Sequence, residues 1–149
     1  MDAVHAHLLL NHIPILGTLF GLLLLLYALV RKNDEIKKVS FGSFVIIGLI
    51  TIPVFLSGLR AAVNLEGVAD AQTIIVQHQE AALLTLLAVV LLGMASFLSL
   101  WLTRDSPGIR PWMVRVVLAL AVISAGLGVW TGNLGGQIRH PEIRAGSMK

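Results

Sequence analysis

Histidine is the residue type in this chain best suited to chemistry. The sequence holds no cysteine and five histidines, which are His5, His7, His12, His78 and His140. Without thiols the chain forms no disulfides, iron–sulfur clusters or thiolate-ligated haem, and it attaches no c-type haem covalently. Imidazole binds haem iron, zinc or copper without a thiol. The histidines are therefore the candidates for a cofactor or metal site.

The composition indicates the kind of protein that must position them. Of the 149 residues, 56% are hydrophobic and 13% are charged, with a mean hydropathy of +0.87. Soluble domains carry about 25% charged residues, so this chain has far less polar surface than a soluble domain needs. The composition argues against a secreted globular enzyme, a nucleic-acid-binding protein and a disordered regulator. We expect a single integral membrane domain over residues 1–149.

Four apolar segments are long enough to cross a bilayer, which takes about 20 apolar residues in a helix. They cover roughly residues 8–30, 41–63, 81–102 and 112–134. Short connections make neighbouring helices antiparallel. The sequence thus predicts an all-α fold, an integral membrane four-helix bundle with up-down-up-down topology. Gly17 and Gly21 offer a close-packing face, which suits either internal helix contact or a homodimer.

The basic residues predict the orientation of the bundle. Seven of the eleven lie in the first and third loops, namely Arg31, Lys32, Lys37, Lys38, Arg104, Arg110 and Arg115. The other four are Arg60, Arg139, Arg144 and Lys149. Loops rich in Lys and Arg stay in the cytoplasm. We therefore expect the first and third loops to be cytoplasmic and both termini to be outside.

With this topology the five histidines lie near the outer membrane surface, although they are far apart in the sequence. The first and third helices run in the same direction and stand diagonally in the bundle. A ligand one turn inside the first helix can share a plane with a ligand at the start of the third. We expect His12 and His78 to be the axial pair of a bis-histidine haem b. His7 and His140 would form a second pair or hydrogen-bond to the ligands.

Charged residues near the same surface suggest further roles. Haem propionates near the outer surface need cationic partners, and Arg60 and Arg139 are placed to supply them. The alternative is that both arginines only anchor their helices at the lipid headgroups. Glu80, two residues after His78, is the candidate hydrogen-bond acceptor for that ring.

One stretch of the first helix carries a recognisable motif. Residues 7–15 read H-L-L-L-N-H-I-P-I, which has the spacing H-x4-H-x-P. This resembles the opening H-P-x-x-V-H-F-P-I of a widespread, largely uncharacterised four-helix family of bacterial membrane proteins, a domain of unknown function. The present sequence departs from the pattern because no proline follows His7.

The resemblance covers nearly the whole chain. It extends to His78 at the start of the third helix and to a Gly-Gly segment at 135–136 that is followed by His140, with a shorter gap than in the family. It implies a four-helix bundle with clustered histidines at His7, His12, His78 and His140, similar in plan to small diheme b-type membrane cytochromes. The implied location is the bacterial cytoplasmic membrane.

We therefore expect a membrane b-type cytochrome that binds one or two haem b groups and transfers electrons near the periplasmic face. Histidine on both axial positions disfavours oxygen chemistry, so electron transfer outranks catalysis. Its partners would be the lipid bilayer and a quinol-linked or periplasmic redox protein, not nucleic acid. The alternatives are a copper-binding, zinc-binding or proton-relay membrane subunit, and a cofactor-free structural subunit of a larger complex. No HExxH motif, nucleotide loop or nucleophile elbow points to hydrolysis.

Overall fold

The computed structural model describes residues 3–63 and 72–140, and every regular element in these ranges is a helix. The helices are α1 (Ala3–Leu10), α2 (His12–Val30), α3 (Asp34–Val63), α4 (Gln72–Leu102) and α5 (Pro111–Arg139). Four stretches are long and apolar enough to cross a membrane: His7–Val30, Asp34–Ala62, Gln72–Leu102 and Pro111–Ile138. Each of the four predicted apolar segments lies within one of the helices α2 to α5, apart from the first residues of segment 8–30, which belong to α1.

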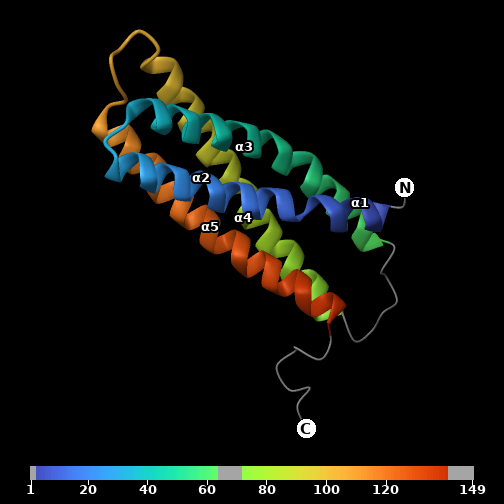
Figure 1. Ribbon diagram of the computed structural model, residues 1–149. Helices are drawn as coiled ribbons and strands as arrows, with labels where there is room; N and C mark the ends of the chain where they lie inside the picture. Colours follow the sequence, from blue (N-terminus) through green and yellow to red (C-terminus); the bar gives the residue numbers. More distant parts are fainter. Residues whose placement is uncertain (1–2, 64–71, 141–149) are drawn as a thin grey trace.

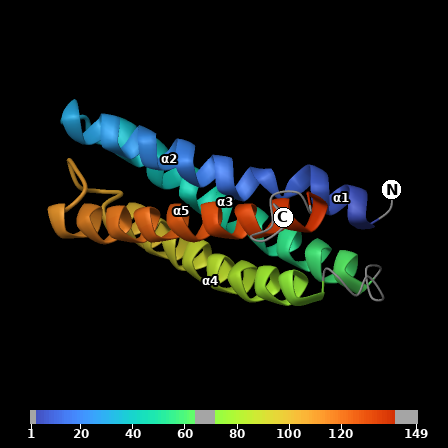
Figure 2. The same cartoon turned by 90° about the horizontal axis from the view of Figure 1, so that it is seen from below.

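Helices α2 to α5 lie side by side along most of their length (Figures 1 and 2). The connections 31–33 and 103–110 meet at one end of the bundle, whereas α1, the end of α3, the start of α4 and the end of α5 meet at the other (Figure 1). Only 28–39% of the most apolar window of each long helix is buried inside the bundle. The outer surface is therefore largely apolar, as contact with lipid requires.

The tightly packed core lies toward the end with the two connections. Phe41, Phe44, Leu25 and Leu92 are fully buried there, and Val117 of α5 packs into the same cluster. Glycines bring α3 and its neighbours close together. Among the described residues, none of the largest fully buried side chains lies at the opposite end of the bundle, and a cavity lies there instead.

Gly17 and Gly21 of α2 pack internally against α3. A Cβ atom added at Gly21 would lie 2.5 Å from Cε1 of Phe44, and one at Gly17 would collide with Ile47. Between α3 and α4, a Cβ atom at Gly48 would lie 3.4 Å from Cα of Gly93. These small residues therefore serve helix contacts within the chain.

Three of the helices are longer than the apolar segments predict. α3 begins at Asp34 rather than 41, α4 begins at Gln72 rather than 81, and α5 continues to Arg139 rather than 134. Hydropathy marks the part of a helix that can lie in lipid, whereas polar residues continue the helix beyond it. The added turns carry much of the polar sequence at both ends of the bundle.

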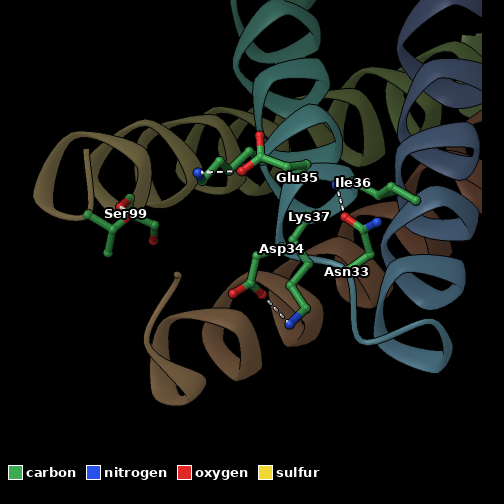
Figure 3. A network of polar contacts seen from close by, with 8 residues as sticks. Asn33, Asp34, Glu35, Ile36, Lys37 and Ser99 are labelled. Atoms are coloured by element: carbon green, nitrogen blue, oxygen red, sulfur yellow. Dashed lines mark hydrogen bonds and ion pairs between the residues drawn. The ribbon is translucent and has the colours of Figure 1, made fainter. Parts of the chain in front are cut away.

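The extra turns of α3 are stabilised by local polar contacts (Figure 3). Oδ1 of Asn33 accepts a hydrogen bond of 3.1 Å from the backbone N–H of Ile36, which caps the helix. Lys37 pairs with Asp34 at 2.7 Å, and the next residue, a lysine, pairs in the same way with Glu35 at 2.8 Å. These i,i+3 pairs explain why a charged segment is helical.

The first helix is interrupted next to Pro14. A proline has no N–H to bond the carbonyl of Leu10, and its ring crowds that carbonyl. The regular helix accordingly stops at Leu10 and starts again at His12, with Asn11 between them. The short α1 then packs mainly against α3 rather than α2 (Figure 2). Pro14 thus occupies the first turn of α2 and interrupts the regular hydrogen bonding there, while Asn11 keeps a helical backbone conformation.

Candidate functional site

A cavity of about 520 Å³ lies at the end of the bundle where α1 meets α3, α4 and α5. Pockets for small molecules and cofactors commonly measure about 300–1,000 Å³. All five helices contribute to its wall, together with the residue after α5. Four histidines line it: His7, His12, His78 and His140. The fold therefore brings these four residues to one place. His5 lies on α1, and its side chain is outside the described part.

His7 reaches across from α1 to α3. Its half-buried ring places Nδ1 3.1 Å from Oγ of Ser57. The Ser57 hydroxyl donates its single proton to the carbonyl of Val54 at 2.6 Å. Ser57 is then the acceptor in its bond with His7, so Nδ1 of His7 carries the proton. The other ring nitrogen, Nε2, keeps its lone pair.

His78 is held in the same way by a different pair of helices. Its Nδ1 lies 3.1 Å from the backbone carbonyl oxygen of Thr131, on α5. A carbonyl can only accept, so Nδ1 of His78 is the protonated nitrogen and Nε2 is again bare. The Thr131 side chain bonds to the hydroxyl of Thr85 at 2.8 Å. This bond ties α4 to α5 at Thr131, the residue whose carbonyl His78 contacts.

Each of the two rings packs against a glycine of the neighbouring helix. A Cβ atom at Gly58 would lie 2.8 Å from Cε1 of His7. A Cβ atom at Gly135 would lie 3.2 Å from Cε1 of His78. The two histidines thus share one arrangement, in which a hydrogen-bond acceptor and a glycine on the next helix fix the ring.

Three polar atoms of the inner wall can accept a hydrogen bond or bind a metal ion. Within residues 3–63 and 72–140, Nε2 of His7 and Nε2 of His78 make no hydrogen bond. Oδ1 of Asn11, which also lines the cavity, is buried without a partner in the same ranges. All three atoms offer an electron pair and no proton. An occupant that complements them is a Lewis acid or a hydrogen-bond donor.

His12 and His140 differ from the other two histidines. Both line the cavity, but both side chains are exposed. His12 is the first residue of α2, and His140 follows the end of α5, where its backbone N–H bonds the carbonyl of Gly136 at 2.9 Å. They form the rim of the cavity rather than its inner wall.

Two of the charged residues expected near the site, Arg60 and Glu80, are not among the described residues that line the cavity. Arg60 is exposed in the last turns of α3. Arg139 ends α5, and its side chain lies outside the described part. Glu80 is exposed, and Nδ1 of His78 bonds to Thr131 in place of the expected Glu80 carboxylate. The expectation for Glu80 was wrong because two residues along a helix turn a side chain by about 200° to another face.

Sequence reasoning did not find the partners of the two inner histidines. They are Ser57, Gly58, Thr131 and Gly135, with Asn11 as the unpaired acceptor beside them. The available signal was a set of small residues near the C-terminal ends of the second and fourth apolar segments, where the helices that carry histidine must pack closely.

Among the described residues, no three histidine, aspartate or glutamate side chains lie together as a metal site. Haem iron takes its four equatorial nitrogens from the macrocycle, so a protein need supply only the axial ligands. The imidazoles of His7 and His78, each with a free Nε2, are the type of ligand that haem iron needs from a protein.

Comparisons with protein-family models, with curated proteins and with solved structures gave no match for this chain. The resemblance to the four-helix bacterial family therefore rests on the H-x4-H-x-P motif and on the positions of His78 and His140. The all-helical structure with four membrane-length helices is consistent with that family.

Proposed function

We propose that this protein crosses the bacterial cytoplasmic membrane four times in up-down-up-down order, with both termini outside. The apolar outer surface and the four long helices support this proposal. So does the charge at the end with the two connections. Seven of the eleven lysines and arginines lie between residues 31 and 38 or between 104 and 115. The positive-inside rule puts that end in the cytoplasm and the histidine cavity near the periplasmic face.

We further propose that the cavity binds haem b and that His7 and His78 would hold it. One observation carries the proposal: two half-buried imidazoles on one cavity each direct Nδ1–H to a protein oxygen and keep a bare Nε2. Histidines that bind metals almost always donate their other N–H in this manner. When bound, haem would supply a one-electron redox centre that reversibly takes up and releases an electron.

The proposed axial pair replaces His12 with His7. His12 is exposed at the rim, whereas the ring of His7 is half-buried and is fixed by Ser57 and Gly58. A fixed ring loses little freedom on ligation, so it is the better ligand. The exposed rings of His12 and His140 are then placed to pair with the propionates at the aqueous edge of the site.

The chain's residues would perform electron transfer by holding the redox centre rather than by taking part in bond changes. His7 and His78 would hold the haem, and the apolar residues that line the cavity would limit the access of water to it. The outward position suits exchange of electrons with a quinol-linked membrane partner or with a periplasmic redox protein. A homodimer through the lipid-facing surface is compatible with this arrangement.

The proposal is tested with the full chain purified in mild detergent after expression with ample haem. We expect a Soret band and a reduced α-band from the parent protein. His7→Ala and His78→Ala should each lose the haem, whereas the matched rim variant His12→Ala should keep it. Helicity measured by circular dichroism controls for folding. Absence of haem uptake by the folded parent protein, or stoichiometric copper or zinc without Soret absorption, would overturn the proposal.

A further inference from the structure

We infer that Ser57 is a positioning residue that sets the proton position and the electron-donating strength of His7. This inference rests on the proposed haem site. Ser57 lies on α3, one residue before the glycine that makes room for the His7 ring. Its hydroxyl oxygen is 3.1 Å from Nδ1 of His7.

The role of Ser57 follows from the count of protons. The hydroxyl has one proton, and the bond of 2.6 Å to the carbonyl of Val54 uses it. Toward His7 the oxygen therefore acts only as an acceptor, which requires Nδ1 to be protonated. The same bond orients the serine side chain along the helix. Ser57 thus fixes both the tautomer and the direction of the ring.

The Ser57 oxygen also changes how strongly His7 donates electrons. A hydrogen bond from Nδ1–H to an oxygen increases the basicity of the opposite nitrogen, Nε2. A more basic ligand stabilises the ferric state more than the ferrous state, because the ferric ion carries the higher charge. Hydrogen bonding around a haem is one of the means by which a protein sets its reduction potential. Loss of the Ser57 hydroxyl should therefore raise the reduction potential.

His7 and His78 differ in the kind of oxygen that accepts the Nδ1–H hydrogen bond. The acceptor for His78 is the backbone carbonyl of Thr131, which every residue type possesses. His7 lies near the backbone carbonyl of Val54 as well, but its contact of 3.1 Å is with the Ser57 side chain, so the residue at position 57 decides whether that second acceptor exists. Of the two acceptors, Ser57 and the carbonyl of Thr131, only Ser57 can be removed by a change of side chain.

The test compares Ser57→Ala with two further variants in the purified haem-bound protein. Ser57→Thr keeps a hydroxyl at the same position. Ser43→Ala is the matched control. Ser43 is also half-buried on α3, and its hydroxyl donates to the backbone carbonyl of Ser40 at 2.7 Å. The readouts are haem content, the midpoint potential from a redox titration, and the electron paramagnetic resonance spectrum of the ferric protein.

We expect Ser57→Ala to shift the midpoint potential to more positive values and to change the ferric resonance spectrum. Ser57→Thr and Ser43→Ala should match the parent protein. Loss of haem from a folded Ser57→Ala protein, with retention by Ser57→Thr, would also support the inference. A Ser57→Ala protein that keeps its haem with an unchanged potential would overturn it. That outcome leaves the haem site intact, whereas a parent protein without haem would refute the proposed function itself.

Discussion

Nδ1 of His78 lies 3.1 Å from the backbone carbonyl oxygen of Thr131 on the neighbouring helix. Because the acceptor is backbone, the bond depends on how α4 and α5 are placed relative to each other. The Thr131 hydroxyl meets the Thr85 hydroxyl at 2.8 Å, and Thr85 donates to the carbonyl of Ala81 at 2.9 Å. Thr131 therefore donates to Thr85. This chain of bonds holds the two helices in the register that His78 requires.

We predict that Thr85→Val weakens both the fold and the site. The substitution keeps the shape of the side chain but leaves the buried Thr131 hydroxyl without its acceptor. Hydrogen bonds between membrane helices contribute about 0.6 kcal/mol on average and up to about 1.7 kcal/mol, and we expect a loss of free energy of unfolding in that range. Haem affinity should fall as well. Unfolding in a denaturing detergent and haem titration measure the two effects.

Ser99→Ala is the control for Thr85→Val. Ser99 lies on the same helix and donates to the carbonyl of Ala95 at 2.7 Å, a bond within its own helix. Its removal should change neither the α4–α5 contact nor haem binding. Equal stability and equal haem affinity for Thr85→Val and Ser99→Ala would show that the hydroxyl pair does not set the register.

We predict that Gly135→Ala reduces haem affinity about tenfold, at the lower end of the effect of substitutions around metal ligands. The new Cβ atom would lie 3.2 Å from Cε1 of His78, so the ring must shift by a few tenths of an ångström. Gly126→Ala on the same helix is the control, because a Cβ atom there meets nothing within 4 Å. If titration gives the two variants the same affinity, the glycine does not serve the ring.

The sequence predicts part of this architecture for simple physical reasons. About 20 consecutive apolar residues are enough to identify a membrane-length helix, so the four long helices follow from hydropathy. A glycine-rich helix face predicts close contact, and Gly21 makes such a contact with Phe44. The extended first turn of α3 did not follow, because its stability comes from ion pairs such as that between Lys37 and Asp34.

The arrangement of the site depends on features that one sequence does not reveal. The choice between His7 and His12 depends on the rotation of each helix and on the interruption beside Pro14. The acceptors Ser57 and Thr131 are 50 and 53 residues away from the rings that they bond. Hydroxyl residues are common in apolar helices, so only the packed structure shows which of them face a histidine.

We predict a larger effect for Gly58→Ala than for Gly135→Ala. A Cβ atom at Gly58 would lie 2.8 Å from Cε1 of His7, which is closer than real Cβ contacts, so the ring must shift from the position in which it bonds Ser57. We expect a loss in haem affinity of about 100-fold, the upper end for substitutions around metal ligands. Gly42→Ala, which meets nothing within 4 Å on the same helix, should bind haem normally. The reverse order of affinities in haem titration would contradict the proposed contact.

The orientation of the protein is tested by labelling single cysteines, which is direct because the chain has none of its own. Arg60 is exposed on α3 at the end of the bundle that holds the histidines, and Lys32 is exposed in the connection at the opposite end. A membrane-impermeant maleimide should label Arg60→Cys in intact spheroplasts and Lys32→Cys only after permeabilisation. Leu23 is exposed in the middle of α2. Leu23→Cys should resist labelling in both cases, because lipid would cover this position in the proposed arrangement.

The labelling result decides which redox partners the site can reach. The excess of lysine and arginine near residues 31–38 and 104–115 should hold that end in the cytoplasm, so we expect the histidine end to face the periplasm. An inverted pattern, with Lys32→Cys labelled first, would move the cavity to the cytoplasmic face and exclude a periplasmic acceptor. If both Lys32→Cys and Arg60→Cys were labelled from outside, α3, which lies between the two positions, would not cross the membrane. Only the expected pattern leaves the cavity where a periplasmic protein can exchange electrons with it.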